Sequence, residues 1–164
     1  MLTFKTILHP TDFSERSALA LRLAGSLARD HGARLIVMHV AVPPPAIAVE
    51  GVALPPPAVD LKLLRAQLQQ VRPDDAPLPV DHRLVEGDAA AEILRLAEET
   101  QCDLIVMGTH GRTWLSRMLM GSVAEQVVRK APCPVLTVKT QQHVQPSTPE
   151  TAPATAGRVV AAAK

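Results

Sequence analysis

The sequence predicts an α/β fold, a doubly wound, five-stranded and mostly parallel sheet with helices on both faces. Strand-like and helix-like segments alternate along the chain, as in the crossover units that join parallel strands. Two runs, Leu35–Val40 and Asp103–Met107, are almost continuously apolar, which is typical of strands covered on both faces. The segments between the strands carry apolar residues at helical spacing, so helices should supply that cover.

Five short segments are predicted as strands. The first is Thr6–His9, which ends at Pro10, and the last is Cys133–Val138. The two apolar runs supply the second and fourth strands. Val80–Val85 alternates apolar and polar residues more than those runs do, so we expect this third strand nearer the edge of the sheet.

Four segments are predicted as helices. Regularly spaced leucines indicate a first helix over residues 14–31, which His31-Gly32 ends. Residues 58–72 form the second helix, Asp88 can cap a third that runs towards Gln101, and Gly121-Ser122 opens the fourth. Residues 41–57 contain two runs of three prolines, so we predict a loop there rather than a helix.

Length and composition indicate one domain over residues 1–140 and a disordered tail over residues 141–164. A chain of 164 residues fits one domain, and its 47% hydrophobic content is enough for a buried core. Aromatic residues make up only 2%, so this core should be aliphatic. The tail is rich in Gln, Pro, Ser, Thr and Ala and has almost no large apolar side chains, a composition that cannot support a packed core.

Charge and aromatic content argue against several classes of partner. The net charge of +1 and the scarcity of aromatic rings disfavour nucleic acid as a ligand. No run approaches about 18 apolar residues, so no membrane span is predicted. The amino terminus lacks the features of a signal peptide, so we expect a cytoplasmic protein. Cys102 and Cys133 lack metal-ligand spacing, and reduced thiols are favoured over a structural disulfide.

The segment from Gly108 to Ser122 is the best candidate for a ligand site. Ligands of doubly wound sheets bind beyond the carboxyl ends of strands where strand order reverses. Gly108 and Gly111 follow a strand and Gly121 precedes a helix, so backbone amides and a positive helix terminus could hold phosphates. Arg112 could add positive charge, although an arginine on a loop is usually only solvated. The P-loop and dinucleotide glycine patterns are absent.

Several motifs together resemble the universal stress protein family. Gly108-x2-Gly111-x9-Gly121-Ser122 matches the G-x2-G-x9-G-[ST] pattern of its ATP-binding members. Ile7–Ser14 is similar to the family's first strand and turn, Leu104–Arg112 to its fourth strand, and Cys133–Val138 to its closing strand. The likeness covers about residues 3–139. It implies a Rossmann-like, adenine nucleotide alpha hydrolase-like fold.

The resemblance implies a site for ATP, ADP or AMP, with Mg²⁺ or Mn²⁺ as an accompanying ion, in a stress-response protein that senses nucleotide. It also implies a homodimer paired through the last strand, Val135–Val138. The matched motifs imply a role for each segment. The turn after the first strand would contact the ribose or adenine, and the end of the second strand would contact adenine. The glycines and the start of the fourth helix would contact the ribose and the phosphates. The implied binding residues are Pro10, Thr11, Asp12, Val40, Gly108, Gly111, Gly121, Ser122 and the amide of Val123, with Arg112 beside them.

Simpler interpretations stand beside these roles. Asp12 and Glu15 have capping-box spacing, so Asp12 could only cap the first helix. Ser122 could be only an N-cap, and Val40 could be only a core residue. No nucleophile–base pair stands near the glycines in sequence, so we expect no enzyme. A slow ATP hydrolase or phosphotransferase, and an interaction module that binds no nucleotide, remain the alternatives.

Overall fold

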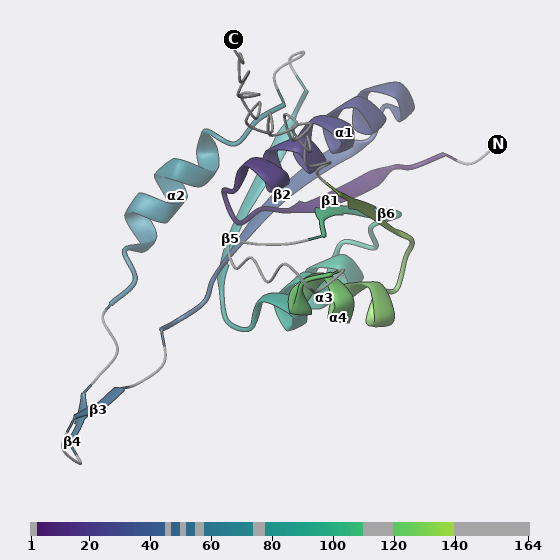
Figure 1. Cartoon of the computed structure of the whole chain (residues 1–164). Helices are drawn as coiled ribbons and strands as arrows, with labels where there is room; N and C mark the ends of the chain where they lie inside the picture. Colours follow the sequence, from purple (N-terminus) through teal and green to yellow (C-terminus); the bar gives the residue numbers. More distant parts are fainter. Residues whose placement is uncertain are drawn as a thin grey trace, which may run out of the picture.

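The computed structural model describes residues 3–44, 47–49, 52–54, 58–73, 78–109 and 120–139 (Figure 1). The predicted tail at residues 141–164 lies outside the described residues, so its disorder stays a prediction. Among the described residues, no helix combines the length and the apolar content needed to cross a bilayer. The elements of the main sheet are the strands β1 (Thr6–Pro10), β2 (Arg34–Ala41), β5 (Val80–Glu86), β6 (Leu104–Gly108) and β7 (Val135–Val138).

These five strands form one sheet in the order β5-β2-β1-β6-β7, and every neighbouring pair is parallel. This confirms the predicted fold class. The chain first builds outward from β1 to β5 and then returns to β6 on the other side of β1, so strand order reverses beside β1. The expected edge position of the Val80–Val85 strand is also confirmed, because β5 pairs only with β2 among the described strands.

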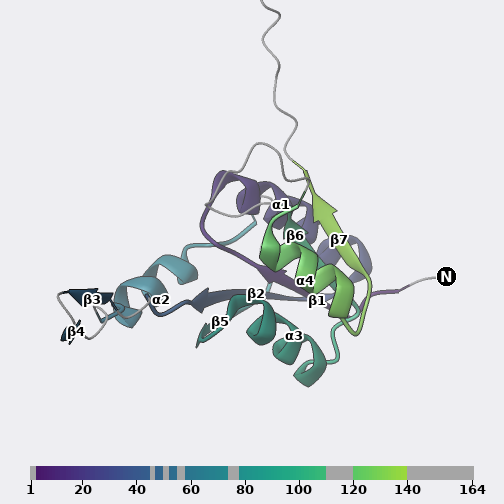
Figure 2. The ribbon, with the colours of Figure 1, turned by 60° about the horizontal axis from the view of Figure 1, so that its bottom comes forward.

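Helices cover both faces of the sheet (Figures 1 and 2). One face carries α1 (Glu15–His31) and α2 (Leu61–Gln69), and the other carries α3 (Ala89–Glu99) and α4 (Ser122–Lys130). The α1 helix ends at Gly32, whose φ of 61° is left-handed and is adopted by glycine at little cost. The predicted helices are therefore present, each within a few residues of its expected bounds.

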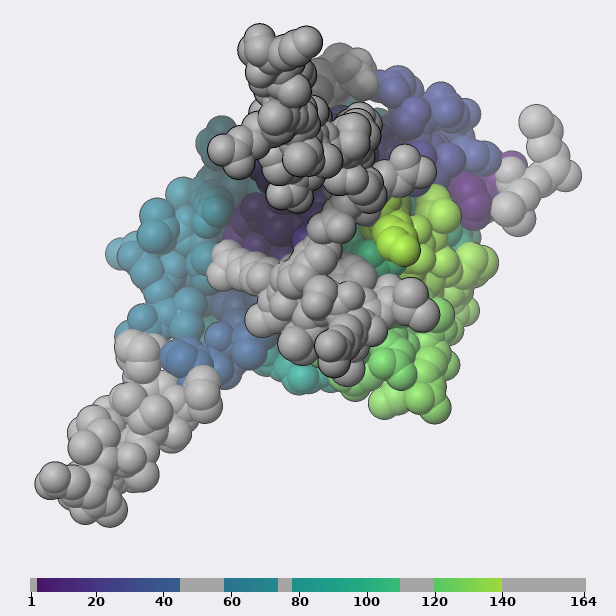
Figure 3. Space-filling model, in the orientation of Figure 1, coloured from purple at the N-terminus to yellow at the C-terminus, as the bar shows by residue number. Residues whose placement is uncertain are grey.

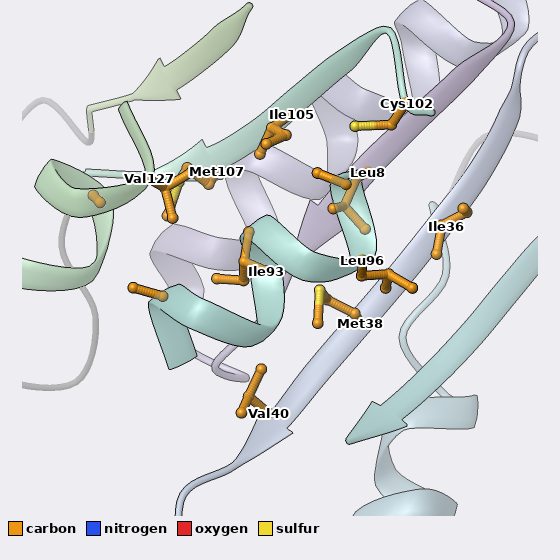
Figure 4. Close-up of a cluster of buried hydrophobic side chains, with 13 residues drawn as sticks. Leu8, Ile36, Met38, Val40, Ile93, Leu96, Cys102, Ile105, Met107 and Val127 are labelled. Carbon is orange, nitrogen blue, oxygen red and sulfur yellow. The ribbon is translucent and has the colours of Figure 1, made fainter. Parts of the chain in front are cut away.

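The core is aliphatic, as the composition predicts, and is divided by the sheet into two clusters. The cluster below α3 and α4 is drawn in Figure 4, where Leu8 of β1, Met38 of β2 and Ile105 of β6 meet Ile93 of α3. The second cluster packs the alanine-rich face of α1 and Leu68 of α2 against the opposite face of the same strands. Small residues on α1 let that helix lie close to the sheet.

The prediction of a loop throughout residues 41–57 was wrong. This segment contains a two-stranded antiparallel hairpin, β3 (Ile47–Val49) and β4 (Val52–Leu54). Between the two proline runs lies a short stretch of β-branched and apolar residues, Ile47–Val49 and Val52–Leu54, whose tendency to form strands the prolines outweighed in the prediction. Figure 1 shows the hairpin standing away from the main sheet.

Candidate functional site

A cavity of about 530 Å³ opens at the carboxyl ends of β1, β2 and β6. This is the edge of the sheet at which strand order reverses, the usual ligand position in doubly wound folds. Its volume falls within the range of small-molecule sites, roughly 300–1,000 Å³. Residues from α2, α3 and the start of α4 complete the wall.

The structure brings the predicted site residues together. Every one of them that the structure describes lines this cavity, although the residues come from four separate parts of the chain: Pro10, Thr11, Asp12, Val40, Gly108, Gly121, Ser122 and Val123. Gly111 and Arg112 lie outside the described residues. Val40 is 9% exposed and belongs to the core cluster as well as to the cavity wall, so the core interpretation and the site interpretation both describe it.

The start of α4 differs from that of the other described helices. Side-chain oxygens of Ser14, Asp60 and Asp88 accept hydrogen bonds from amides in the first turns of α1, α2 and α3, whereas α4 has no side-chain hydrogen bond at its cap. Gly121 is its N-cap residue and Ser122 is its first helical residue, so the interpretation of Ser122 as the N-cap was wrong.

The first turn of α4 consequently offers backbone amides to the cavity. Its first intrahelical bond runs from Glu125 N to Gly121 O, at 2.9 Å. The amides of Ser122, Val123 and Ala124 precede that bond, and all three residues line the cavity. Uncapped amides and the positive end of a helix dipole at one place form an anion-binding arrangement.

Asp12 shapes the turn that carries it but does not cap α1. Ser14 is the N-cap residue, and its side chain accepts a hydrogen bond from Ser17 N. Oδ1 of Asp12 instead accepts hydrogen bonds from Ser14 N at 3.0 Å and from Ser14 Oγ at 2.6 Å. The capping-box interpretation of Asp12 was therefore wrong, because the helix begins two residues later than that interpretation requires. This Asx turn places the carboxylate in the cavity wall.

A buried hydrogen-bond network holds the turn after β1 in place. His9 donates from Nδ1 to the carbonyl of Val106 at 2.8 Å, which leaves Nε2 as the acceptor, 3.3 Å from the hydroxyl of Ser17. That hydroxyl also lies 2.9 Å from Thr11 Oγ1. Both ring nitrogens of His9 therefore lie within hydrogen-bond distance of buried partners.

Backbone strain is located at the same turn. Phe13 has a φ of 64°, in the left-handed region that bulky residues rarely adopt. Its ring packs against His39, with ring centroids 4.2 Å apart. His39 in turn donates from Nδ1 to the carbonyl of Thr11 at 2.7 Å. Packing and hydrogen bonding therefore keep the strained turn in the conformation that presents Thr11 and Asp12 to the cavity.

Full burial lowers the pKa of His9 from 6.5 to about 4, against the opposing influence of the Val106 carbonyl and the Asp12 charge. The unfolded chain binds a proton as the pH falls through 6.5, whereas the folded chain does so only near pH 4, so stability is lost between these values. We expect a loss of about 3 kcal/mol in the free energy of unfolding from this histidine. Urea unfolding at a series of pH values measures it. His9→Asn retains a donor for the Val106 carbonyl and should remove this contribution to the slope of unfolding free energy against pH. If the two proteins show the same pH dependence of stability, His9 is not its cause.

Several cavity residues were not predicted. Val59 and Leu64 come from the α2 region, and Ala89 and Ile93 come from the start of α3. Thr109 directly follows Gly108 and also lines the cavity, but it is not part of the glycine pattern. The position of Ala89 in the sequence could have indicated its place. Ala89 directly follows Asp88, which caps the helix after a strand, and in this topology such a helix begins at the carboxyl edge of the sheet.

The described residues contain no group of three or more His, Cys, Asp or Glu side chains that could hold a metal ion. Asp12 is the one carboxylate in the cavity wall, as far as the described residues show. The chemistry of the cavity is therefore apolar contact on one side and backbone amides with hydroxyl groups on the other.

Comparison with known proteins agrees with this geometry. Residues 3–139 match the Universal stress protein family. The chain belongs to this family. Among its curated relatives, a universal stress protein of Methanocaldococcus jannaschii is 35% identical over 140 residues, which cover 83% of this chain and 82% of the relative.

Solved structures of the family have the same fold. Universal stress protein UspA from Lactobacillus plantarum has a TM-score of 0.66 at 25% identity, covering 84% of this chain and 99% of that one. A universal stress protein solved in complex with cAMP has a TM-score of 0.65 at 26% identity, covering 85% of this chain and 100% of that one.

Proposed function

We propose that this protein binds ATP or ADP in the cavity at the carboxyl edge of the sheet and acts as a nucleotide-dependent sensor or regulatory module in a stress response. One observation carries the proposal: the uncapped start of α4 faces the same cavity as an apolar wall built by β2, α2 and α3. A nucleotide requires both surfaces, one for its phosphates and one for its base.

The phosphates are assigned to the start of α4. The amides of Ser122 and Val123 can donate to phosphate oxygens, and the Ser122 hydroxyl can add a further hydrogen bond. Gly121 keeps this approach open because it has no side chain. Gly111 and Arg112 are assigned to the same phosphate group on the family motif.

The base is assigned to the apolar wall. Val40, Leu64 and Ile93 line the cavity from β2, α2 and α3, and the backbone of Val40 is assigned to the edge of adenine on the family resemblance. Pro10, Thr11 and Asp12, beside them on β1 and its turn, are assigned to the ribose. The family member in complex with cAMP supports an adenine nucleotide as the ligand class.

A Mg²⁺ or Mn²⁺ ion would be held mainly by the nucleotide. Phosphate oxygens are hard ligands that such ions prefer, and one or two carboxylates commonly complete the shell. Asp12 is the residue in the described cavity wall with suitable chemistry. The ion would neutralise phosphate charge, and Asp12 would orient it.

Binding without rapid turnover fits the chemistry of the turn. His9 is 0% exposed and does not line the cavity, so it is not placed to act as a base on a bound nucleotide. We therefore propose a binding module rather than an efficient enzyme. A phosphate-release assay tests the alternative of a slow hydrolase: rates above those of a Ser122→Ala variant and of buffer would favour it.

Calorimetric titration of the full chain with Mg-ATP, Mg-ADP and Mg-GTP tests the proposal. We expect saturable binding of the adenine nucleotides and a rise in Tm that increases with ligand concentration. Mg-GTP is the control for the base. Neither heat nor a Tm shift at millimolar ATP would reject nucleotide binding and leave an interaction module of the same fold.

We also propose that the chain forms a homodimer through Val135–Val138. β7 is an edge strand of the described sheet, and Leu136 on it is 37% exposed. Pairing with a second copy would satisfy the unpaired backbone groups of such an edge. The choice of the last strand as the dimer interface rests on the family resemblance.

Leu136→Asp should shift the protein from dimer to monomer, because a charge placed at each copy of the interface is costly to bury. Sedimentation velocity should show at least a roughly tenfold weaker dimer. Leu63→Asp is the matched control, since Leu63 is exposed on α2 and α2 lies on the opposite side of the view in Figure 3 from α4 and β7. A Leu136→Asp protein as dimeric as wild type would show that this edge is not the interface.

The cytoplasmic location and the absence of nucleic-acid binding stay predictions.

A further inference from the structure

The two cysteines lie side by side at the end of the sheet opposite the cavity. Their sulfur atoms are 3.4 Å apart, although 31 positions separate Cys102 from Cys133 in the sequence. Cys102 precedes β6 and Cys133 precedes β7, and these two strands are parallel neighbours with Ile105 opposite Val135. Both cysteines are therefore at the amino ends of their strands, while the cavity is at the carboxyl ends.

The backbone around both thiols is well fixed. Cys102 N donates to the carbonyl of Ala97 at 3.0 Å, and Gln101 before it turns the chain with a left-handed φ of 48°. Cys133 stands between Pro132 and Pro134, whose rings restrict the backbone. The carbonyl of Pro134 accepts a hydrogen bond from Ile105 N at 3.0 Å. The closeness of the two sulfur atoms is therefore built into the strand pairing.

Solvent reaches the two thiols unequally. Cys102 is 6% exposed and is part of the buried cluster in Figure 4, whereas Cys133 is only partly buried and packs against that cluster. Burial raises the pKa of both thiols, and the charge of Asp103 adds to this effect. Both cysteines are thus mainly protonated at neutral pH, and Cys133 is the one that a small oxidant meets first.

We propose that Cys102 and Cys133 are a disulfide-forming pair that closes when the protein meets hydrogen peroxide. The Cys133 thiolate attacks one peroxide oxygen, and the second oxygen leaves as hydroxide, which gives a sulfenic acid. Cys102 sulfur then attacks the Cys133 sulfur, the S–S bond forms, and the sulfenic oxygen leaves as water with the Cys102 proton. In total, two thiols lose two protons and two electrons, and one peroxide is reduced to two waters. A dithiol reductant reverses the bond.

The bond would tie together two elements of the fold. It would close a loop that runs from Cys102 through β6 and α4 to Cys133. A covalent link across a loop of this length restricts the unfolded chain, so oxidation should raise Tm by roughly 10 °C. The sulfur atoms must approach from 3.4 Å to about 2.05 Å, a local movement at the end of two paired strands.

Mass spectrometry of the full chain, reduced and then treated with hydrogen peroxide, tests the proposal. We expect a mass lower by about 2 Da, loss of both titratable thiols, and a cross-linked peptide that contains both cysteines. Reaction should be slow at pH 7 and faster at pH 9, because the thiolate is the reactive form. The rise in Tm should disappear after treatment with dithiothreitol.

Variants at each position separate this bond from other oxidation. Cys133→Ser and Cys102→Ala should both lose the peroxide-dependent rise in Tm, and the remaining thiol should gain oxygen atoms instead. A wild-type protein that only gains oxygen, or that forms disulfides only between chains on a non-reducing gel, would overturn the proposal. The test does not depend on nucleotide binding, since it needs no ligand.

Discussion

Replacing Gly121 by valine should abolish adenine-nucleotide binding and leave the fold intact. Gly121 has a φ of −72° and a ψ of 154°, an extended conformation that valine adopts readily. Its amide can still donate to the carbonyl of Thr109, a bond of 2.7 Å. The added isopropyl group would stand at the cavity wall in front of the first α4 amides, where we place the phosphates. We expect an increase in Kd of at least about a hundredfold, roughly 3 kcal/mol.

Calorimetry with Mg-ATP measures this loss, and circular dichroism with thermal unfolding checks the fold. Gln126→Val is the matched control, because it adds the same side chain to an exposed position of the same helix outside the cavity wall. If Gly121→Val retains wild-type affinity, the start of α4 does not hold the phosphates. If wild type itself binds no nucleotide, the proposed function fails before this variant is informative.

Leu8→Ala should cause a large loss of stability. Leu8 lies on β1, the middle strand of the sheet, and is 0% exposed within the cluster under α3 and α4 (Figure 4). Removing its isopropyl group loses transfer free energy and leaves a void that strands on both sides hinder from closing. We expect the free energy of unfolding to fall by about 2–5 kcal/mol.

Urea unfolding of both proteins measures this difference. Leu63→Ala is the matched control: the same chemical change at a side chain that is 64% exposed should alter stability by less than about 0.5 kcal/mol. Equal effects of the two substitutions would mean that Leu8 is not in a tightly packed core. A loss above the expected range would point to collapse of the sheet rather than a local void.

Strands and helices were predictable because their signals are local. The apolar run Leu35–Val40 marked β2, and the leucine spacing before Gly32 marked α1 and its end. Asp88 was predicted as a cap, and its carboxylate accepts from Ala91 N at 2.9 Å. Each of these signals acts within a few residues, so neighbouring sequence is enough to detect it.

Elements that depend on exceptions to local rules were harder to predict. The β3–β4 hairpin was missed because prolines on both sides outweighed a short β-forming stretch. The alternative that Ser122 is only an N-cap rested on residue type, yet the helix begins one position earlier than that alternative requires, with Gly121 as the cap. The residue at which a helix begins depends on the path of the chain that leads into it as well as on residue type.

The sequence by itself determined the order of strands and helices, the aliphatic core and the glycine positions, because periodicity and residue type encode them directly. Only the tertiary structure decided that Asp12, Val40 and Ser122 line one cavity, and that Cys102 and Cys133 lie within 3.4 Å of each other. Both results come from strand order, which brings β1 beside β6 and β6 beside β7. That order is a balance of packing across the whole chain, and no local segment contains it.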